Sequence, residues 1–191
     1  AKLWLEQYAQ IPVTVDIASE YRYNTTPKIK NSLFIAVSQS GETADTLAAL
    51  RKAKDHNYIS TIAVCNVLES SLAREADRCL PTSAGPEIGV ASTKAFVSQL
   101  ATLALMGIAV GDQIGVGKKA LKAALSQIKA LPDIIESILG MSEEIEEMTW
   151  GLDGKKHALF LGRGLHYPIA LEGALKMKEI SYIHAEAYPA G

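Results

Sequence analysis

The fold is decided by residues 33–56, which read LFIAVSQSGETADTLAALRKAKDH. The stretch opens with an unbroken apolar run, Leu33 to Val37, which is typical of a strand covered on both faces in a parallel sheet. A polar loop follows from Ser38 to Glu42, and Thr43 to His56 has the apolar spacing of a helix. The stretch therefore predicts the strand, loop and first helix of a parallel βαβ unit.

The same alternation continues along the chain. We expect strands at 59–65 and 78–81, a short helix at 70–76, a loop at 82–89 and a long helix at 90–110. Before the deciding stretch, we expect a helix at 2–10 ended by Pro12, a strand at 13–17 and a turn at 24–27. Strands that alternate with helices at this spacing predict an α/β fold, an open parallel sheet in a three-layer αβα sandwich.

The pattern breaks at 111–117, and the remaining segments divide the chain into three parts. Helices are expected at 118–131 and 132–150, then a strand at 157–161 and a helix at 167–180. We therefore predict a first α/β domain over 1–116, a helical connection over 117–156 and the beginning of a second α/β domain of the same type over 157–191.

Composition excludes several classes of protein. Of the 191 residues, 48% are hydrophobic and 21% charged, which is usual for a soluble globular protein. The net charge of −2 gives no sign of nucleic-acid binding. The most apolar stretch, 100–110, is about half as long as a membrane span, so no membrane is expected as a partner.

Cysteine and histidine usage points to a metal-free protein from a reducing compartment. Cys65 and Cys79 are too few for a disulfide framework and have no zinc-ligand spacing, so buried free thiols and a cytoplasmic location are expected. The four histidines are scattered, with no pair at helical spacing. No metal site is predicted.

The loop at 38–43 is the strongest local signal for a ligand. Ligands of open α/β sheets bind outside the carboxyl ends of the strands, where a helix start offers unpaired N–H groups to an anion. Gly41 would let the backbone approach a ligand, and Ser38, Ser40 and Thr43 add hydroxyl groups. These features favour a phosphate monoester over a nucleoside triphosphate, since the P-loop motif is lacking. Capping of the helix by Ser40 or Thr43 remains an alternative.

A second loop, 85–94, leaves the same predicted sheet edge after the third strand. Its position makes Ser92 and Thr93 candidate ligand contacts. The alternative is that these two side chains cap the long helix and that Lys94 is a solvated charge.

The last predicted helix carries Glu172, Lys176 and Glu179 on one stripe, at i, i+4 and i+7. A solvated ion-pair face explains this spacing. A carboxylate beside an ammonium group is also what proton abstraction next to a carbonyl requires, as in aldose–ketose isomerisation. Both interpretations stay open.

Five segments, taken in order, resemble a known family. They are SQSGET at 38–43, EIGVASTK at 87–94, GRG at 162–164, YPIALEGALK at 167–176 and KEISYIHAEA at 178–187. The first two resemble the sugar isomerase (SIS) domain, and the whole succession resembles the isomerase half of the glutamine–fructose-6-phosphate aminotransferases. The resemblance covers essentially the whole chain.

This resemblance implies a reaction and a set of site residues. The family makes glucosamine 6-phosphate from fructose 6-phosphate and glutamine, with two SIS subdomains, a dimeric active site, and neither metal nor organic cofactor. The residues that would hold the sugar phosphate are Ser38, Gln39, Ser40 and Thr43, with Val90 (through its backbone) and Ser92 touching the sugar. Glu179 would be the base that moves the proton between C1 and C2, and Lys176 would handle a hydroxyl proton.

The resemblance also implies that the chain is truncated at both ends. The family's glutaminase domain, the first SIS strand, a histidine associated with ring opening and the Schiff-base lysine all lie outside these 191 residues. We therefore expect an aminotransferase as the parent protein and no synthesis of glucosamine 6-phosphate by this chain alone. The alternatives are a non-catalytic sugar-phosphate sensor and a simpler phosphosugar isomerase.

Overall fold

A computed structural model describes residues 1–25, 27, 30–56 and 58–191. The chain forms two compact units, Ala1–Leu125 and Ser126–Gly191, which are described here one at a time. The turn predicted at 24–27 includes position 26, which lies outside the described residues.

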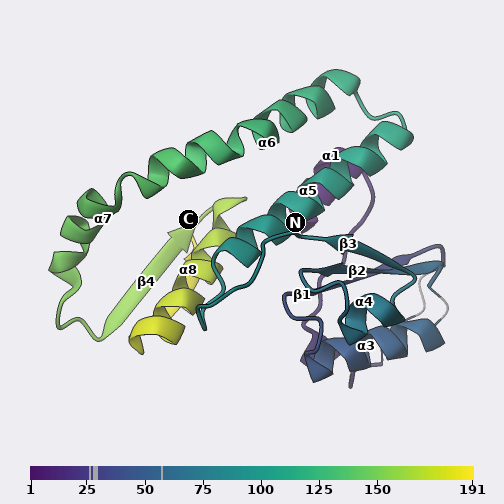
Figure 1. The fold of residues 1–191 in the computed structure, drawn as a ribbon, viewed down its shortest axis with the longest axis horizontal. Helices are drawn as coiled ribbons and strands as arrows, with labels where there is room; N and C mark the ends of the chain where they lie inside the picture. The colour runs from purple at the N-terminus through teal and green to yellow at the C-terminus, as the bar shows by residue number, and fades with distance from the viewer. Residues whose placement is uncertain (26, 28–29, 57) are drawn as a thin grey trace. The chain divides into compact units, whose positions relative to one another are not determined.

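The first unit is built on a parallel sheet (Figure 1). Its strands β1 (Leu33–Ser38), β2 (Ser60–Cys65) and β3 (Arg78–Pro81) lie side by side in that order. The last residues of the three strands, Ser38, Cys65 and Pro81, are in register. The loops that follow the strands therefore leave the sheet from a single edge, as predicted from the sequence.

Helices cover both faces of this sheet (Figure 1). On one face, α3 (Ala44–Asp55) and α4 (Ser71–Glu75) pack on β1 and β2. Their core contains Ala36, Leu47, Leu50, Ala63 and Leu72. On the other face, α5 (Lys94–Gln113) contacts β2 and packs against α1 (Lys2–Ala9), and the short α2 (Ala18–Tyr21) lies against α3. The α/β prediction with parallel strands is confirmed.

Small residues allow α1 and α5 to pack closely. A Cβ atom on Gly111 would lie 2.1 Å from the Tyr8 carbonyl oxygen, and one on Gly107 would lie 3.3 Å from a Leu5 methyl group. The two helices thus meet along one glycine-bearing stripe of α5, which buries Leu5 and Ala9 of α1.

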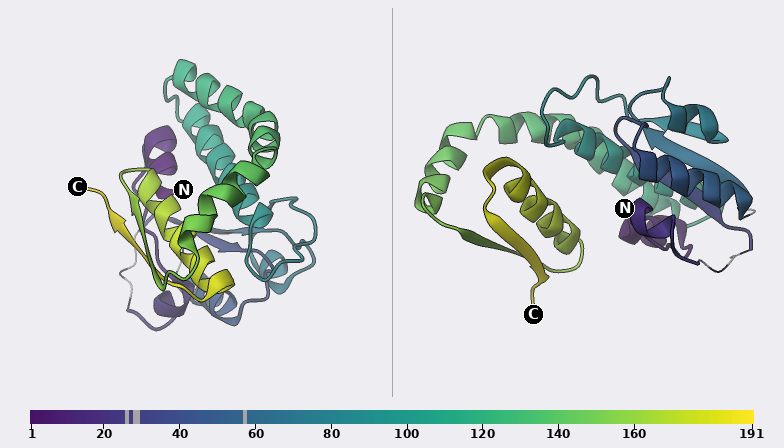
Figure 2. Two further views of the ribbon diagram at one scale, coloured as in Figure 1. Left: turned by 90° about the vertical axis from the view of Figure 1, so that its left-hand side faces the viewer. Right: turned by 90° about the horizontal axis from the view of Figure 1, so that it is seen from below.

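The second unit contains a smaller parallel sheet (Figure 2). Strands β4 (His157–Gly162) and β5 (His184–Pro189) pair in parallel, and α8 (His166–Ser181) packs on them. The Phe160 ring of β4 lies 2.9 Å from the place of a Cβ on Gly173, so the helix approaches the sheet closely. On the opposite face Leu159 and Leu161 are 68% and 66% exposed.

Between the two sheets the chain is helical. Helix α6 (Lys118–Leu139) is followed by α7 (Ser142–Thr149) and the 3₁₀ turn η1 (Trp150–Leu152). The sequence analysis predicted that one helix ends and another begins at Pro132. This prediction is wrong, because α6 runs through this residue. Proline removes one helical hydrogen bond, but the helix continues through Pro132, which is exposed.

Other predictions about secondary structure also need correction: α2 was not expected, and the helix predicted over 132–150 is interrupted between Leu139 and Ser142. Residues 13–17 form no strand. The segment is apolar, with Val15 and Ile17 68% and 70% exposed, but a strand needs a hydrogen-bonded neighbour, and none of the described strands pairs with it. Helix α5 begins at Lys94 instead of Val90, and β5 was not expected at all.

Helix α5 is longer than the apolar run recognised in the sequence. At 20 residues it is long and apolar enough to cross a membrane by length and composition. A single such helix is weak evidence, because a core helix passes the same test. Here α5 packs against α1 and β2.

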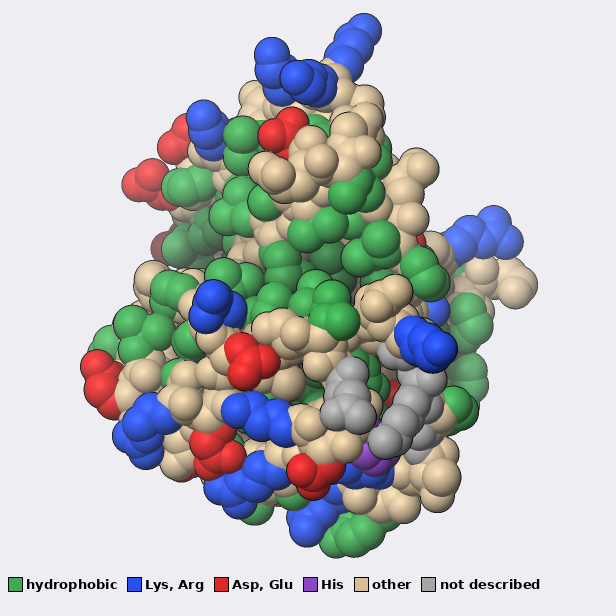
Figure 3. Space-filling model, turned by 90° about the vertical axis from the view of Figure 1, so that its right-hand side faces the viewer, with side chains coloured by type: hydrophobic (Ala, Val, Ile, Leu, Met, Phe, Trp, Pro, Cys, Tyr) green, Lys and Arg blue, Asp and Glu red, His purple; other side chains and the backbone are tan. Residues whose placement is uncertain are grey.

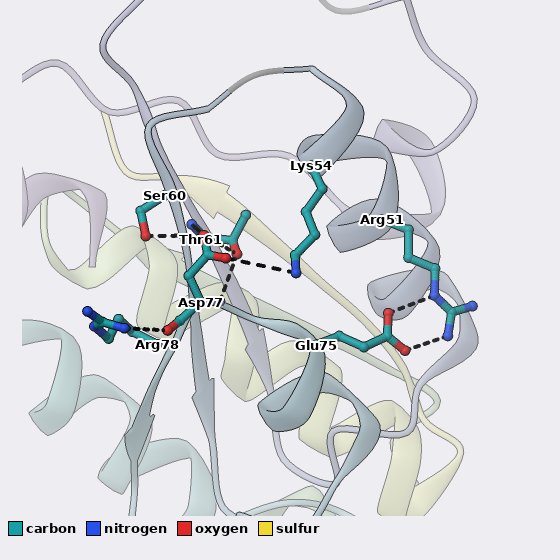
Figure 4. A network of polar contacts seen from close by, with 7 residues as sticks. All are labelled: Arg51, Lys54, Ser60, Thr61, Glu75, Asp77 and Arg78. Carbon is teal, nitrogen blue, oxygen red and sulfur yellow. Dashed lines mark hydrogen bonds and ion pairs between the residues drawn. The ribbon is translucent and has the colours of Figure 1, made fainter.

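The amino-terminal edge of the first sheet is held by a polar network (Figure 4). An Asp77 carboxylate oxygen accepts hydrogen bonds from the Thr61 backbone N–H at 2.7 Å, the Thr61 hydroxyl at 3.0 Å and the Ser60 hydroxyl at 3.2 Å. Lys54 lies 3.9 Å from the other oxygen. Nearby, Arg51 forms a two-point ion pair with Glu75. This edge is tied together by its own side chains.

Apolar side chains are also exposed on this unit. Figure 3 shows a broad patch of hydrophobic side chains on one face of the molecule, with charged side chains gathered below it. The exposed apolar residues of the first unit include Val15, Ile17, Leu33 and Val37.

Candidate functional site

Three loops meet at the carboxyl edge of the first sheet. They follow β1, β2 and β3, and they begin at Gln39, Asn66 and Thr82. Hydrogen bonds run between them: the Asn66 backbone N–H donates to the Gln39 carbonyl at 3.2 Å, and the Ala84 N–H donates to the Asn66 side-chain oxygen at 2.9 Å. The candidate site is therefore a joined set of loops.

We call residues 38–43 the phosphate loop, after the ligand that the sequence predicts for it. The Ser38 hydroxyl oxygen, which is buried, accepts from the Gly41 N–H at 3.0 Å. The Ser40 hydroxyl oxygen accepts from the Glu42 N–H at 3.2 Å. These bonds use the hydroxyl oxygens as acceptors, so each hydroxyl hydrogen can still be donated to a ligand.

The phosphate loop leads into the start of α3. Thr43 is the residue before the first turn, and its side chain makes no capping hydrogen bond. The Ser40 hydroxyl bonds Glu42, outside the helix. The capping alternative from the sequence is thus wrong for both side chains. N–H groups of the first helical turn have no helical acceptor, which makes this end of α3 suited to an anion.

Helix α4 supports the phosphate loop from behind. The Leu72 N–H donates to the Gly41 carbonyl at 3.0 Å, and the Ser71 N–H donates to the Glu42 carboxylate at 2.7 Å. The bond from Ser71 lowers the pKa of Glu42. Gly41 has φ of +70°, and an added Cβ would lie 2.1 Å from the Ser70 hydroxyl. Only glycine fits at this position.

The loop of residues 82–93 carries the two predicted sugar contacts. Val90 is fully exposed, and Ser92 is half-buried beside the start of α5. The Thr93 side chain does not cap this helix. Glu87 takes that role, because its carboxylate accepts from the Thr93 N–H at 3.4 Å and from the Ala95 N–H at 3.1 Å.

A broad, open cavity lies between the loops. Its volume is about 650 Å³, and its lining residues are Gln39, Asn66, Val67, Glu69, Ser83, Gly85, Pro86 and Glu87. Gln39 is the one predicted phosphate contact among them. The cavity adjoins the phosphate loop and has room for a small ligand.

The predicted catalytic pair lies in the second unit, on α8. The Lys176 ammonium group is 2.6 Å from a Glu179 carboxylate oxygen and 3.5 Å from Glu172. The hydrogen bond to Glu179 is the main cause of a raised pKa for Lys176. The stripe predicted from the sequence is confirmed, and Lys176 is held as a cation that can donate to an oxygen.

Some features of the site were missed in the sequence. Asn66 joins two loops, Glu42 bonds the phosphate loop to the start of α4, and Glu87 bonds the third loop to the start of α5. A polar residue directly after a buried strand was the signal available for Asn66. Both cysteines are free, with Cys65 buried and Cys79 half-buried. Among residues 1–25, 27, 30–56 and 58–191, no three His, Cys, Asp or Glu side chains are grouped to hold a metal ion.

Comparison with known proteins identifies the fold family. The SIS domain model matches residues 1–109 and 151–191. The chain belongs to the SIS domain family. The two matched segments lie on either side of α6 and α7, so the SIS residues are those that build the two parallel sheets and the loops of the candidate site.

Individual relatives of this SIS chain are close. It is 56% identical over 191 residues to glutamine–fructose-6-phosphate aminotransferase [isomerizing] of Legionella pneumophila (strain Lens), and 52% identical over 192 residues to the protein of that name from Pseudomonas putida. All of the chain is covered in both matches, but only 31% of each relative. The chain thus spans about a third of these curated relatives.

A solved structure agrees with this SIS assignment. The C-terminal domain of glucosamine-fructose-6-phosphate aminotransferase from Francisella tularensis superposes with a TM-score of 0.96 at 48% identity. The match covers 98% of this chain and 53% of that domain's chain. The parallel α/β arrangement is therefore the SIS fold of that domain.

Proposed function

We propose that this chain is part of the isomerase half of a glutamine–fructose-6-phosphate aminotransferase, and that it binds the sugar phosphate. The observation that carries the proposal is 56% identity over all 191 residues to a relative of that name. The phosphate loop and the Lys176–Glu179 pair give the same proposal a physical basis. The parent protein would make glucosamine 6-phosphate from fructose 6-phosphate and glutamine.

The phosphate group of the substrate would bind at the phosphate loop. Ser38, Gln39, Ser40 and Thr43 would surround it, and the start of α3 would direct N–H groups at its oxygens. A ligand with this charge suits the positive end of a helix dipole. Two of these hydroxyl groups, on Ser38 and Ser40, already accept from the loop's own N–H groups, which leaves their hydrogens for the ligand. Val90 and Ser92 would touch the sugar.

Glu179 would transfer a proton between C1 and C2 of the open-chain sugar. As a carboxylate it accepts the proton from one carbon and returns it to the other, so the residue ends the step unchanged. Lys176, whose pKa is raised beside Glu179, is charged and would donate to a substrate hydroxyl oxygen. No metal or organic cofactor enters this scheme.

The setting of this reaction is part of the proposal. The free cysteines suit a reducing, cytoplasmic compartment. A homodimer would complete the active site in the parent protein. With a third of the relatives' length, this chain would bind the sugar phosphate without producing glucosamine 6-phosphate.

Calorimetric titration tests the binding proposal. Fructose 6-phosphate should bind to the chain, and unphosphorylated fructose should not bind measurably. Replacing Ser40 by alanine should weaken binding of fructose 6-phosphate by about 1–2 kcal/mol, because a hydrogen bond to a charged group is lost.

Ser137→Ala, at an exposed position of α6, is the matched control and should leave the affinity unchanged. Equal binding of fructose and its phosphate would contradict the proposed phosphate site. Conversion of fructose 6-phosphate to glucose 6-phosphate by the chain alone would favour the simpler phosphosugar isomerase.

A further inference from the structure

Asn66 connects all three loops of the candidate site. It is the first residue after β2, between the phosphate loop and the loop of residues 82–93. Its backbone N–H donates to the Gln39 carbonyl at 3.2 Å. Its side-chain NH₂ donates to the Gly85 carbonyl at 2.7 Å, and its side-chain oxygen accepts from the Ala84 N–H at 2.9 Å. One residue therefore holds both neighbouring loops.

The partners of Asn66 require an amide at this position. The Ala84 N–H can only donate and the Gly85 carbonyl can only accept, so together they fix which end of the amide is oxygen. The same oxygen accepts from the Thr82 hydroxyl at 3.1 Å. An aspartate would place a charged oxygen against the Gly85 carbonyl, and an alanine would leave all three partners without this side chain.

The two halves of Asn66 act on different loops. Its backbone holds Gln39 of the phosphate loop, and that bond would survive any substitution that keeps the N–H group. In the part of the chain that the structure describes, its side chain bonds residues 82–85, which begin the loop that carries Val90 and Ser92. A change of side chain thus releases one loop and leaves the other in place.

We propose that Asn66 is a positioning residue that sets the spacing between the phosphate loop and the loop of residues 82–93. This inference rests on the proposed function, because it assumes a ligand that spans both loops. A sugar phosphate touches the phosphate loop with its phosphate and the second loop with its sugar. Inorganic phosphate needs the phosphate loop alone. Asn66 therefore matters for the first ligand and not for the second.

The test measures the dissociation constants of fructose 6-phosphate and of inorganic phosphate for the same variant. Titration of Asn66→Ala with fructose 6-phosphate should show a dissociation constant raised by about tenfold or more, because the sugar contacts are displaced. The dissociation constant for inorganic phosphate should change by less than about twofold. Asn24→Ala, at an exposed position of the first unit, is the matched control and should change neither. A cooperative thermal transition of each variant checks that it folds.

A second variant tests the hydrogen bond itself. In Asn66→Asp the carboxylate should be repelled by the Gly85 carbonyl at neutral pH, whereas the protonated acid can donate to it again. The affinity for fructose 6-phosphate relative to the unmodified chain should therefore recover only as the pH falls through the ordinary aspartate pKa of about 3.9. A residue that merely fills space would show no such recovery.

The outcomes separate the two proposals. Equal weakening of both ligands by Asn66→Ala, or no weakening of either, would overturn the positioning role while the proposed function stands. An unmodified chain that binds inorganic phosphate and fructose 6-phosphate with equal affinity would also overturn it, because the ligand would not span the loops. A folded, unmodified chain that binds neither ligand would overturn the proposed function and this inference with it.

Discussion

The amino and carboxyl edges of the first sheet carry similar polar side chains, but these side chains have different roles. At the amino edge, one Asp77 oxygen takes three hydrogen bonds from Thr61 and Ser60, so the network is closed on itself (Figure 4). At the carboxyl edge, Asn66 bonds one loop to the next, and Glu42 bonds the phosphate loop to the start of α4. There, however, the hydroxyl hydrogens of Ser38 and Ser40 can still be donated to a ligand. The Thr43 side chain also leaves the start of α3 uncapped.

This contrast indicates which edge can bind a ligand. Polar groups that satisfy one another stabilise the fold, whereas donors held in place without an acceptor are available to an anion. Substitutions at the amino edge should change stability alone. Substitutions at the carboxyl edge should change binding, with or without a change in stability.

The largest effect is expected at the carboxyl edge, from Gly41→Ala. The new Cβ would meet the Ser70 hydroxyl at 2.1 Å, and alanine is strained at φ of +70°. We expect a loss of about 2–3 kcal/mol in the free energy of unfolding and a loss of fructose 6-phosphate binding by about tenfold or more. Denaturant titration and calorimetry measure the two effects. The control is Gly117→Ala, where a Cβ would meet nothing within 4 Å. Normal binding by Gly41→Ala would remove the phosphate loop from the site.

A smaller effect, on stability alone, is expected at the amino edge from Asp77→Asn. The hydrogen bond from the Thr61 backbone N–H is the main cause of a lowered pKa for Asp77, and the Thr61 hydroxyl adds to it. A carboxylate whose pKa is lower in the folded chain stabilises the fold above its unfolded pKa of about 4. That stabilisation is lost as the pH falls through the folded pKa.

Asp77→Asn should therefore lower the melting temperature by a few degrees at pH 7. The melting temperature of this variant should also decrease less than that of the unmodified chain as the pH falls from about 5 to about 2. Thermal melting followed by circular dichroism over this pH range measures both. The affinity for fructose 6-phosphate should not change. If the melting temperatures of Asp77→Asn and of the unmodified chain changed with pH in the same way, the Asp77 network would contribute little to stability.

The smallest effect is expected from Arg51→Ala. Its ion pair with Glu75 is two-pronged, at 2.6 and 2.8 Å, but the Arg51 side chain is 61% exposed. Exposed pairs contribute little and are screened by salt. We expect a change of about one degree or less in the melting temperature, smaller still at about 1 M salt. A large loss of stability would mean that this network supports the sheet more than its exposure indicates.

Much of the first unit could be predicted from its sequence because the local signals agree with one another. The apolar runs around Ala36 and Ala63 are strands buried under α3 and α4, and the polar segment after each is a loop at one edge. The stripe of Lys176 and Glu179 was also predictable, since spacing along one helix fixes which side chains meet.

The rest could not be predicted, because it depends on neighbours distant in the sequence. Residues 13–17 have the composition of a strand but no described strand to pair with. Helix α6 passes through Pro132, although a proline removes one helical hydrogen bond. Capping of α5 by Glu87, in place of Ser92 or Thr93, depends on how the loop folds back. The ties made by Asn66 span 16 to 27 positions of sequence.

In the proposed function, the carboxyl edge of the first sheet holds the phosphate of a sugar phosphate. Titration of the ¹⁵N-labelled chain with fructose 6-phosphate, followed by amide chemical shifts, tests it most directly. We expect the largest shifts on residues 39–46, with none at Thr61 or Asp77 on the opposite edge. Shifts centred on the Asp77 network, or none in residues 39–46 at saturating ligand, would contradict it.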